Sequence, residues 1–383
     1  MSHYLDHNAT TPVRPEVIAV MSQAMARVGN PSSVHRDGQM AARQVEDVRR
    51  VVGQLLCALA EDVIFTSGGT EATNLAIHSA IDAGGARSLI VSAIEHEAVS
   101  ATARASGLPV ETMPVTAQGL ADLAWLETRL ASWDAERDGP PVLALMLANN
   151  EVGTIQPVAE AARLIHEAGG LMIVDAIQAA GKIAVDFAGL GADYMAISAH
   201  KFGGPQGVGA LIAACNAPLS RHHHGGGQEK GRRGGTLNVA GIAGLGCALE
   251  MSVGELDQFA ALAKQRDALA DAMRHAAPEI RILGEGAPRL PNTLSIAHPA
   301  WKGETQVMAM DLAGISISAG SACSSGKTRA SKTGLALGLD DTTATGLIRI
   351  SLGWTTMQDD IDAFVSAWTN ALARITPKLQ VSA

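Results

Sequence analysis

The sequence has few cysteines, few aromatic residues and no long apolar run. Its cysteines are too few and too scattered for a disulfide framework or for a zinc site made from spaced cysteine pairs. Aromatic residues make up 3% of the chain, and no cluster of lysine and arginine is interleaved with them as in nucleic-acid-binding surfaces. No stretch approaches the roughly 20 apolar residues that cross a bilayer. We therefore expect no disulfide framework, no nucleic-acid partner and no membrane span. The four cysteines are Cys57, Cys215, Cys247 and Cys323.

The composition is that of an ordinary globular protein, with 47% hydrophobic and 17% charged residues and a net charge of −9. The charge is spread along the chain rather than gathered in blocks. The first residues, MSHYLDHNATTP, have neither the basic leader nor the apolar segment of an export signal. The sequence thus predicts a cytoplasmic protein.

Alternating strand and helix patterns predict an α/β fold with a mostly parallel central sheet flanked by helices. The length of 383 residues exceeds what one hydrophobic core usually serves, so we expect two domains. The expected strands are 62–66, 88–93, 142–147, 171–175, 193–198 and 207–213, and the helices between them are 71–83, 96–105, 157–168 and 179–182.

After residue 255 the pattern changes to a long charged helix, 255–276, followed by short strands near 280–283 and 292–297. This change predicts a smaller α+β domain. We expect the large domain to span 15–255, and the small domain to combine 1–14 with 256–383.

The cysteines differ in their surroundings. Cys57 and Cys247 lie in helical patterns rich in alanine and leucine, and Cys215 follows the strand-like GALIAA, so all three are expected to be buried thiols. Cys323 lies in SAGSACSSG, whose small and polar residues cannot form much core. The sequence predicts that Cys323 is carried on a surface loop.

Three segments at predicted strand ends carry candidate chemistry, because open α/β sheets bind ligands there. Ser67–Glu71 (SGGTE) lies between a strand and a helix, which suits an anion such as phosphate, although such turns also serve as plain connections. Asp175 ends a strand and needs a cationic partner, unless it caps a following helix. Lys201, within SAHKFGGP, is placed to form a covalent bond to a carbonyl carbon, unless it is a surface lysine on a turn.

The order and spacing of these segments resemble the cysteine desulfurases of the class V aminotransferase family, which have the type I fold of pyridoxal-phosphate enzymes. The resemblance extends from Tyr4 to about Ile361. The segments that carry it are YLDHNATTPV, GNPSSVHRDG, FTSGGTEATN, IEHEAV, ANNEVGTIQPV, VDAIQAAGK, SAHKFGGPQGVGAL, GGGQEKGRRGGT, LPNTLSI, SAGSACSSG and IRISLG.

The resemblance implies a role for each of several residues around pyridoxal 5'-phosphate. Lys201 would bind the cofactor covalently and move the substrate proton, His96 would stack on the ring, and Asp175 would keep the ring nitrogen protonated. Gln178 and Asn149 would donate hydrogen bonds near the ring oxygen. The phosphate would be held by Gly69, Thr70, Ser198 and His200, together with Thr236 of a neighbouring subunit, which predicts a homodimer.

The resemblance also implies the substrate and the reaction. Arg349 would bind the carboxylate of L-cysteine through its planar fork, with Asn149, Asn8 and His7 nearby; the alternative is an ion pair at the domain interface. Cys323 would attack the substrate sulfur and hold it as a persulfide, releasing alanine. The sulfur would then pass to an iron–sulfur scaffold or another acceptor protein.

Other activities remain open at this point. A selenocysteine lyase or a cysteine sulfinate desulfinase would use the same cofactor residues. A class V transaminase would not need Cys323, and a scaffold protein without catalysis would not need Lys201, Asp175 and Cys323 together. The sequence predicts no resident metal, and the one metal role it suggests is a transient iron–sulfur ligand at Cys323.

Several residues depart from the usual pattern of the family. Val152 replaces a threonine, and residues 330–333 (ASKT) replace a turn that often contains Pro-Ser. His7 and Trp354 occupy variable positions. His222, His223 and His224 are consecutive, and adjacent residues do not easily converge on one ion. We expect Lys230, Arg232 and Arg233 to support the phosphate region or the dimer contact.

Overall fold

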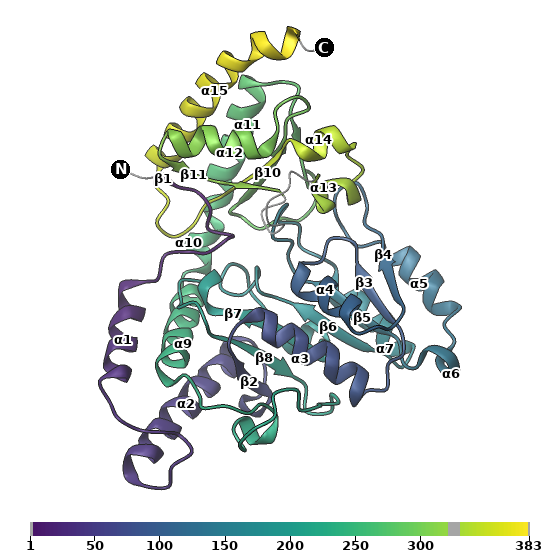
Figure 1. Ribbon diagram of the computed structural model, residues 1–383, viewed down its shortest axis with the longest axis vertical. Coiled ribbons are helices and arrows are strands. Elements are labelled where there is room, and N and C mark those ends of the chain that lie inside the picture. The colour runs from purple at the N-terminus through teal and green to yellow at the C-terminus, as the bar shows by residue number, and fades with distance from the viewer. Residues whose placement is uncertain (1–2, 321–329, 382–383) are drawn as a thin grey trace.

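The computed structural model describes residues 3–320 and 330–381, with side chains of the last helix as far as Arg374. Cys323, and with it the predicted cysteine loop, lies outside the described residues. Two lobes are visible in Figure 1, and each is built around its own sheet. The large lobe holds the longer sheet, and the small lobe contains the C-terminal helix.

The sheet of the large lobe has seven strands in the order β2-β8-β7-β6-β5-β3-β4. Neighbouring strands are parallel except β8, which is antiparallel to β2 and β7. The predicted mostly parallel α/β fold is therefore confirmed. The strands are β2 Val63–Thr66, β3 Leu89–Ser92, β4 Val110–Met113, β5 Val142–Met146, β6 Leu171–Asp175, β7 Tyr194–Ser198 and β8 Gly209–Ala213.

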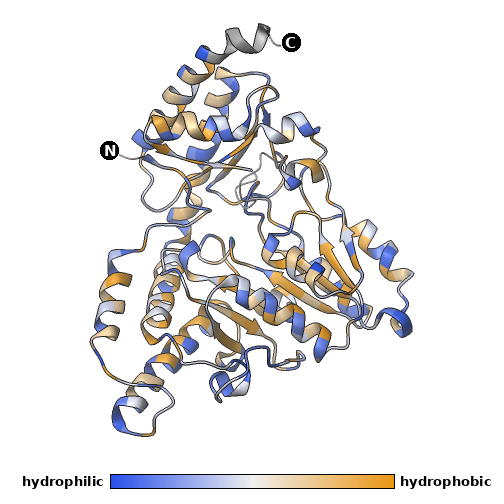
Figure 2. Ribbon diagram, in the orientation of Figure 1, coloured by the Kyte–Doolittle hydropathy of each residue, from blue (hydrophilic) through white to orange (hydrophobic). Residues whose placement is uncertain are grey.

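Helices cover both faces of this sheet, and its strands are almost entirely apolar (Figure 2). Because side chains alternate along a strand, Ile64 joins the hydrophobic cluster under α3 and α4, whereas Phe65 joins the cluster under α2, α7 and α9. The helices of this lobe are α1 Pro15–Met25, α2 Arg36–Leu55, α3 Gly69–Asp82, α4 Glu97–Ala105, α5 Leu123–Ala131, α6 Ala135–Asp138, α7 Val158–Glu167, α8 Phe187–Leu190 and α9 Val239–Gly254, with 3-10 turns η1 Ala60–Asp62, η2 Ala199–Lys201 and η3 Glu229–Gly231.

The small lobe has an antiparallel sheet in the order β12-β13-β10-β9 and a separate hydrophobic cluster that includes Trp301, Phe364 and Trp368. The N-terminal strand β1 (His3–Tyr4) pairs with β11 (Ile315–Ser316), so both ends of the chain belong to this lobe. Its other elements are α10 Leu256–Ala260, α11 Leu262–Ala276, β9 Arg281–Ile282, β10 Thr293–Ala297, α12 Gly303–Leu312, β12 Ser318–Ala319, α13 Lys332–Ala336, α14 Asp341–Thr345, β13 Leu347–Ser351 and α15 Gln358–Val381.

Two helix predictions were wrong. Residues 179–182 form a turn, because Gly181 has a positive φ of 71° that a right-handed helix does not allow. The predicted helix 255–276 is divided into α10 and α11 at Ala261. Among the described residues, no single helix is both long and apolar enough to span a membrane, and α9 taken together with 256–276 meets that test only across a 64° bend.

The expected burial of Cys57 and Cys215 was also wrong. Cys57 is exposed because it follows the end of α2 with a φ of 53°, and Cys215 is exposed in the turn after β8. Cys247, on α9, is partly buried. A helical or strand-like neighbourhood did not reveal that the first two lie just past the ends of their elements.

Candidate active site

The candidate site lies where the C-terminal ends of β5, β6 and β7 meet the N-terminal ends of α3 and α4. Asp175 ends β6, Ser198 ends β7, and His96 caps α4. Parallel strands bring their C-terminal ends to one edge of a sheet, which is why residues far apart in the sequence gather here. The N-terminal segment and β13 of the small lobe complete the site.

The turn before α3 has the properties of an anion site. The N-cap residue of α3 is Gly68, which has no side chain. The first N–H groups of α3 are therefore not satisfied by a capping side chain. A Cβ on Gly69 would lie 2.1 Å from Ile177 Cδ1, so a larger residue there would displace the Ile177 side chain. Ser198 lies beside the same turn. Hydrogen bonds from Arg233 and Ser67 outweigh burial and lower the pKa of Glu71 to about 2.

Asp175, His96 and Lys201 lie close enough to influence one another electrostatically. Burial raises the pKa of Asp175, whereas the backbone N–H of Ile177 and the charges of His96 and Lys201 lower it. No helix follows Asp175 directly, so it closes a turn with Ile177 rather than capping a helix. Nδ1 of His96 accepts the Ala98 N–H at 3.0 Å, which fixes the ring and places the proton of the neutral form on Nε2.

Lys201 extends toward the N-terminal segment rather than lying on a surface turn. Its Nζ donates to the backbone oxygens of Asn8 at 2.7 Å and Ala9 at 2.8 Å. The neighbouring His200 shares a hydrogen bond between Nδ1 and Thr10 Oγ1 at 3.2 Å. Burial, Lys201 and Lys182 lower the pKa of His200 to about 4, so His200 is neutral at physiological pH.

Lys182 was not predicted, yet it joins two of the predicted residues. Its Nζ donates to Asn8 Oδ1 at 2.8 Å and to Gln178 Oε1 at 2.5 Å, while Gln178 Nε2 donates to Asn8 O at 2.8 Å. Burial and the charges of Lys201 and Arg349 lower the pKa of Lys182 well below its usual range. Lys182 thus fixes the side chains of Asn8 and Gln178 next to Lys201.

Replacing Lys182 with methionine is expected to lower kcat/KM by about 100-fold, because misplacement of active-site groups by 1 Å costs this much. Methionine retains much of the buried volume and removes the donor that orients Asn8 and Gln178. Steady-state kinetics and thermal unfolding should be measured together. Lys264→Met, on the exposed surface of α11, is the matched control. Reduced unfolding temperature with unchanged kinetics would contradict a positioning role.

Arg349 occupies the middle of β13 and is 6% exposed. Its Nη2 donates to Asp6 Oδ1 at 2.7 Å and its Nη1 to Asn150 O at 2.9 Å. The ion pair with Asp6 therefore lies within the small lobe, and the contact with the large lobe is a hydrogen bond to a backbone oxygen. Its Nε is buried without a hydrogen-bond partner in the structure. Ser318 Oγ donates to the other oxygen of Asp6. Arg349 therefore retains an unused donor at the site.

The side chain of Asn149 forms hydrogen bonds within the protein that its predicted role near the cofactor did not include. Its Oδ1 accepts the N–H groups of Glu151 and Val152, and its Nδ2 donates to Ile94 O at 3.1 Å. Asn149 thereby shapes the turn after β5. Val152 is fully buried in a hydrophobic cluster with Leu283 and other residues, which explains why an apolar side chain replaces threonine there.

Glu151 and Glu97 bind the residues that follow the cysteine segment. Glu151 accepts hydrogen bonds from Ser331 Oγ at 2.7 Å and Thr333 Oγ1 at 2.9 Å, and Lys332 forms an ion pair with Glu97. Burial raises the pKa of Glu151 against these hydrogen bonds. The unusual ASKT sequence thus supplies two hydroxyls and a charge to this edge of the site.

Glu95 is a second acidic group that the sequence did not indicate. Its Oε1 accepts the Met146 N–H at 2.5 Å, and its Oε2 is buried without a partner. Burial and the neighbouring charge of Asp175 raise the pKa of Glu95 well above its usual range. Burial therefore favours the protonated form of Glu95. The residue stands directly before His96, but sequence alone does not show that its side chain turns inward.

Two further predicted residues lie at the margins. His7 is buried, its Nδ1 shares a hydrogen bond of 2.7 Å with Thr11 Oγ1, and burial and Lys182 lower its pKa to about 4. Thr236 is exposed, in the segment between β8 and α9. In that segment Arg233 pairs with Glu71, and Arg232 donates to Glu61 O. Trp354 packs against the guanidinium of Arg14.

Comparisons with known proteins agree with this arrangement. The family model described as Aminotransferase class-V matches residues 3–364. A cysteine desulfurase of Cereibacter sphaeroides is 41% identical over 92% of this chain and 91% of its own length. An IscS-like cysteine desulfurase of Mycobacterium tuberculosis is 37% identical over 97% of this chain and 96% of its own. The solved structure of a NifS-like protein from Rickettsia africae has a TM-score of 0.89 and 32% identity, covering 97% of this chain and 100% of that one. The chain therefore belongs to the class V aminotransferase family and, within it, to the cysteine desulfurases.

Proposed function

We propose that this protein removes sulfur from L-cysteine, releases L-alanine and retains the sulfur as a persulfide on Cys323. The observation that carries the proposal is the meeting of Lys201, Asp175 and His96 at one edge of the sheet, beside an anion-binding turn. The predicted family and its cofactor are confirmed by the comparisons, since class V enzymes of this kind depend on pyridoxal 5'-phosphate. The activity is inferred from the relatives, which are named as cysteine desulfurases.

The residues present fit this cofactor. Uncapped N–H groups at Gly69 and Thr70, with Ser198 and His200, suit a phosphate, and a Cβ at Gly69 would press against Ile177. A buried carboxylate at Asp175 suits a protonated ring nitrogen. His96 would cover the ring, with Gln178 and Asn149 near its oxygen. When bound, the cofactor withdraws electrons from the substrate Cα.

The chain's own residues bind the substrate and move its protons. The substrate carboxylate would bind the guanidinium of Arg349, whose Nε has no hydrogen-bond partner, with Asn8 and Asn149 beside it. Lys201 takes the proton from the substrate Cα. The carbonyl oxygens of Asn8 and Ala9 can hold the resulting ammonium group of Lys201, as they do in this structure. The neutral His200 adds no positive charge that would repel it.

The sulfur step requires a second thiol. The sulfur of Cys323, as a thiolate, attacks the sulfur of L-cysteine; the S–S bond forms, the C–S bond breaks, and its electron pair stays with the carbon fragment that leaves as alanine. A selenocysteine lyase or a sulfinate desulfinase shares the cofactor residues, but the relatives at 35–41% identity are named as cysteine desulfurases.

Cys323→Ser tests the proposal. Wild-type protein incubated with L-cysteine should gain the mass of one sulfur atom on the peptide that contains Cys323, and alanine should form in equal amount. The serine variant is expected to lose sulfur release by more than about 100-fold, since removal of the nucleophile removes a covalent step.

Exposed cysteines provide the controls for this experiment. Cys57→Ser and Cys215→Ser remove thiols on the surface of the large lobe and should leave persulfide formation unchanged. Persulfide on Cys57 or Cys215 and none on Cys323, or undiminished sulfur release from Cys323→Ser, would contradict the assignment.

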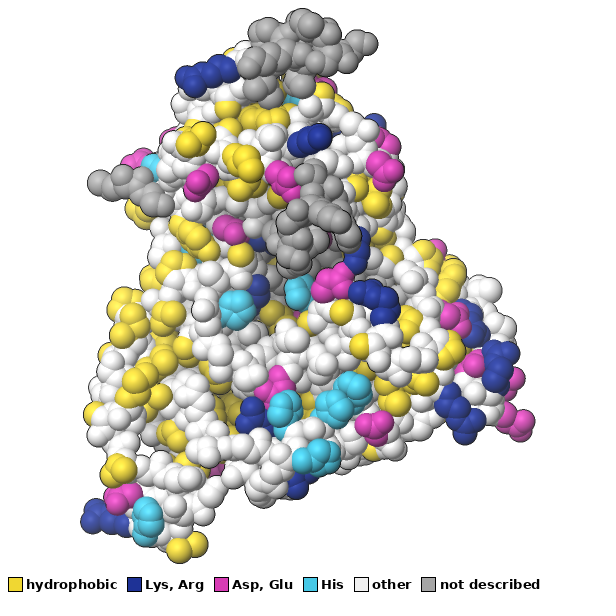
Figure 3. Space-filling model, viewed as in Figure 1, with side chains coloured by type: hydrophobic (Ala, Val, Ile, Leu, Met, Phe, Trp, Pro, Cys, Tyr) yellow, Lys and Arg dark blue, Asp and Glu magenta, His cyan; other side chains and the backbone are white. Residues whose placement is uncertain are grey.

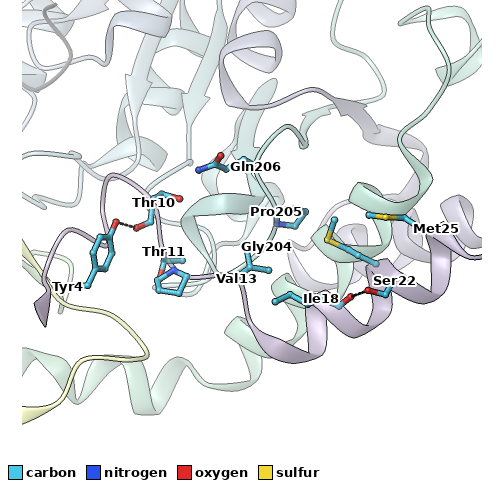
Figure 4. A pocket seen from close by; sticks show the side chains of 12 residues that line it. Tyr4, Thr10, Thr11, Val13, Ile18, Ser22, Met25, Gly204, Pro205 and Gln206 are labelled. Atoms are coloured by element: carbon cyan, nitrogen blue, oxygen red, sulfur yellow. Dashed lines mark hydrogen bonds between the residues drawn. The ribbon is translucent and has the colours of Figure 1, made fainter. Parts of the chain in front are cut away.

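We infer a homodimer from one face of α1 and α2. Val17 and Ala24 pack inward toward α9, whereas Ile18 and Met25 on the outer face of α1 are 54% and 66% exposed. Figure 4 shows these side chains beside a cavity of about 560 Å³ that also reaches Thr10 and Pro205. Val28, Val34 and Met40, which follow along the chain, are also exposed apolar residues. A second copy would cover these exposed residues and bring its Thr236 to the phosphate.

The double variant Ile18→Glu, Met25→Glu is expected to be monomeric and at least 10-fold less active, because two buried charges oppose association. Light scattering after gel filtration gives the mass, and sulfur release gives the activity. Met357→Glu places the same charge on an exposed methionine of the small lobe and should leave the dimer intact. A dimeric double variant would contradict the location of the interface.

We further propose that the chain divides into a large domain of residues 15–255 and a small domain of 1–14 plus 256–383. The separate sheets and hydrophobic clusters support this division.

The sulfur would pass from Cys323 to an iron–sulfur scaffold or another acceptor protein. Unpaired cysteines at 57, 215 and 247 support a reducing compartment, and hence the cytoplasm.

A further inference from the structure

Histidine side chains gather on one face of the large lobe (Figure 3). We call residues 214–238, between β8 and α9, the connecting segment. His222 of this segment lies next to His78 of α3. Their rings are 3.9 Å apart between centroids and are tilted by 30°. Asp82 stands four residues after His78 on α3, so both side chains project from the same face of the helix. The ligating atoms of His78, Asp82 and His222 all lie within 4.8 Å of one another.

Two imidazoles and one carboxylate form a donor set typical of zinc and its neighbours in the first transition series. Ligands at positions i and i+4 of a helix converge on one ion in known zinc sites. A carboxylate and two imidazole nitrogens complement a divalent cation.

We propose that His78, Asp82 and His222 form a binding site for one divalent transition-metal ion of the zinc class. Metal–ligand bonds of about 2.0–2.2 Å require the three donors to approach by roughly 1 Å. All three side chains are at least partly exposed and can rotate to do so. A solvent molecule completes the tetrahedron, as in other zinc sites with three protein ligands.

The surrounding contacts hold the two elements in register for such a site. Ser220 N donates to Ser79 Oγ at 3.1 Å, and Ser220 Oγ donates to Asp82 Oδ2 at 3.4 Å. Further along, Glu229 is buried and paired with Arg49, and Arg233 is paired with Glu71. A bound ion would add a link near the start of the connecting segment.

The expectation from the sequence, that three consecutive histidines do not share one ion, is compatible with this site. Only His222 of the three takes part, and its partners come from α3. His223 lies instead 3.8 Å from Glu71, near the opposite end of α3. The site does not depend on the proposed desulfurase activity.

Binding of Zn²⁺ and Co²⁺ tests the proposal by competition with a chromogenic chelator. All proteins carry Cys323→Ser, so that this thiol cannot bind the metal. We expect one equivalent of Zn²⁺ per chain. Its affinity should fall by more than about 100-fold in His78→Gln, Asp82→Asn and His222→Gln, because loss of partners outside the ligand set already costs 10–100-fold.

His223→Gln and His224→Gln are matched controls, since they remove equally exposed neighbours of His222. They should bind Zn²⁺ as tightly as the parent. Hydrogen exchange of residues 214–222 should slow when Zn²⁺ is added to the parent and not to His78→Gln. Binding that survives His78→Gln, that is lost equally in His224→Gln, or that is absent from the parent would overturn the proposal.

Discussion

Replacing Lys201 with alanine is expected to abolish sulfur release, with a loss of at least 10²–10⁴-fold from its proton transfer alone. The amine of Lys201 is held between the carbonyl oxygens of Asn8 and Ala9, next to Asp175 and His96. Alanine removes both the covalent attachment of the cofactor and the group that takes the substrate proton. The visible absorbance of the bound cofactor and the rate of alanine formation measure the two losses separately.

Lys201→Arg separates the amine from its charge. Arginine keeps a cation beside the two carbonyl oxygens, but it is not deprotonated in proteins and cannot attack a carbonyl carbon. It should therefore be as inactive as Lys201→Ala while retaining the folded structure. Lys264→Ala, on the exposed side of α11, should behave as wild type. Substantial alanine formation by Lys201→Arg would show that another amine performs this role.

The sequence predicted the central sheet well because its strands are buried on both faces. Near-continuous apolar runs such as LMIVD and VLALM mark such strands, and β5 and β6 were placed to within one residue. The antiparallel strand β8 was recognised as a strand, but nothing in GALIA indicates its direction. The turn at 179–182 was mistaken for a helix because its alanines favour one, whereas Gly181 adopts a positive φ that the alanines do not indicate.

The sequence predicted the polar residues of the candidate site that lie at strand ends. It did not predict the charged residues that are enclosed around them. Lys182, Glu95 and Glu151 look like ordinary surface residues in the sequence, because lysine and glutamate are rarely buried. Their positions depend on tertiary contacts: Lys182 binds Asn8 of the N-terminal segment, Glu95 accepts the Met146 N–H, and Glu151 binds two hydroxyls of residues 331–333. Asn149 also shapes the turn after β5 by accepting two backbone N–H groups, and spacing along the chain could not indicate this role.

Asp175→Asn is expected to lower kcat by about 10²–10³-fold, as removal of one preorganised electrostatic partner does in other enzymes. Asparagine has the same shape and its Oδ1 can still accept the Ile177 N–H, but it has no charge to retain a proton on the ring nitrogen. Because burial raises the pKa of Asp175, wild-type activity should fall as acid protonates this carboxylate. The asparagine variant should lack that acidic decline, which a pH profile of kcat will show.

Glu95→Gln provides the sharpest comparison, since Glu95 and Asp175 are neighbouring carboxyl groups in different environments. Burial and Asp175 raise the pKa of Glu95 well above its usual range, which favours the protonated form that glutamine resembles. The change should therefore leave kcat within a few-fold of wild type, whereas Asp175→Asn should not. If Glu95→Gln instead proved the more damaging, the negative charge of the site would belong to Glu95, and Asp175 would not be the partner of the ring nitrogen. Two adjacent acids can share one charge only if their environments favour different protonation states, and this pair of variants reveals which one carries it.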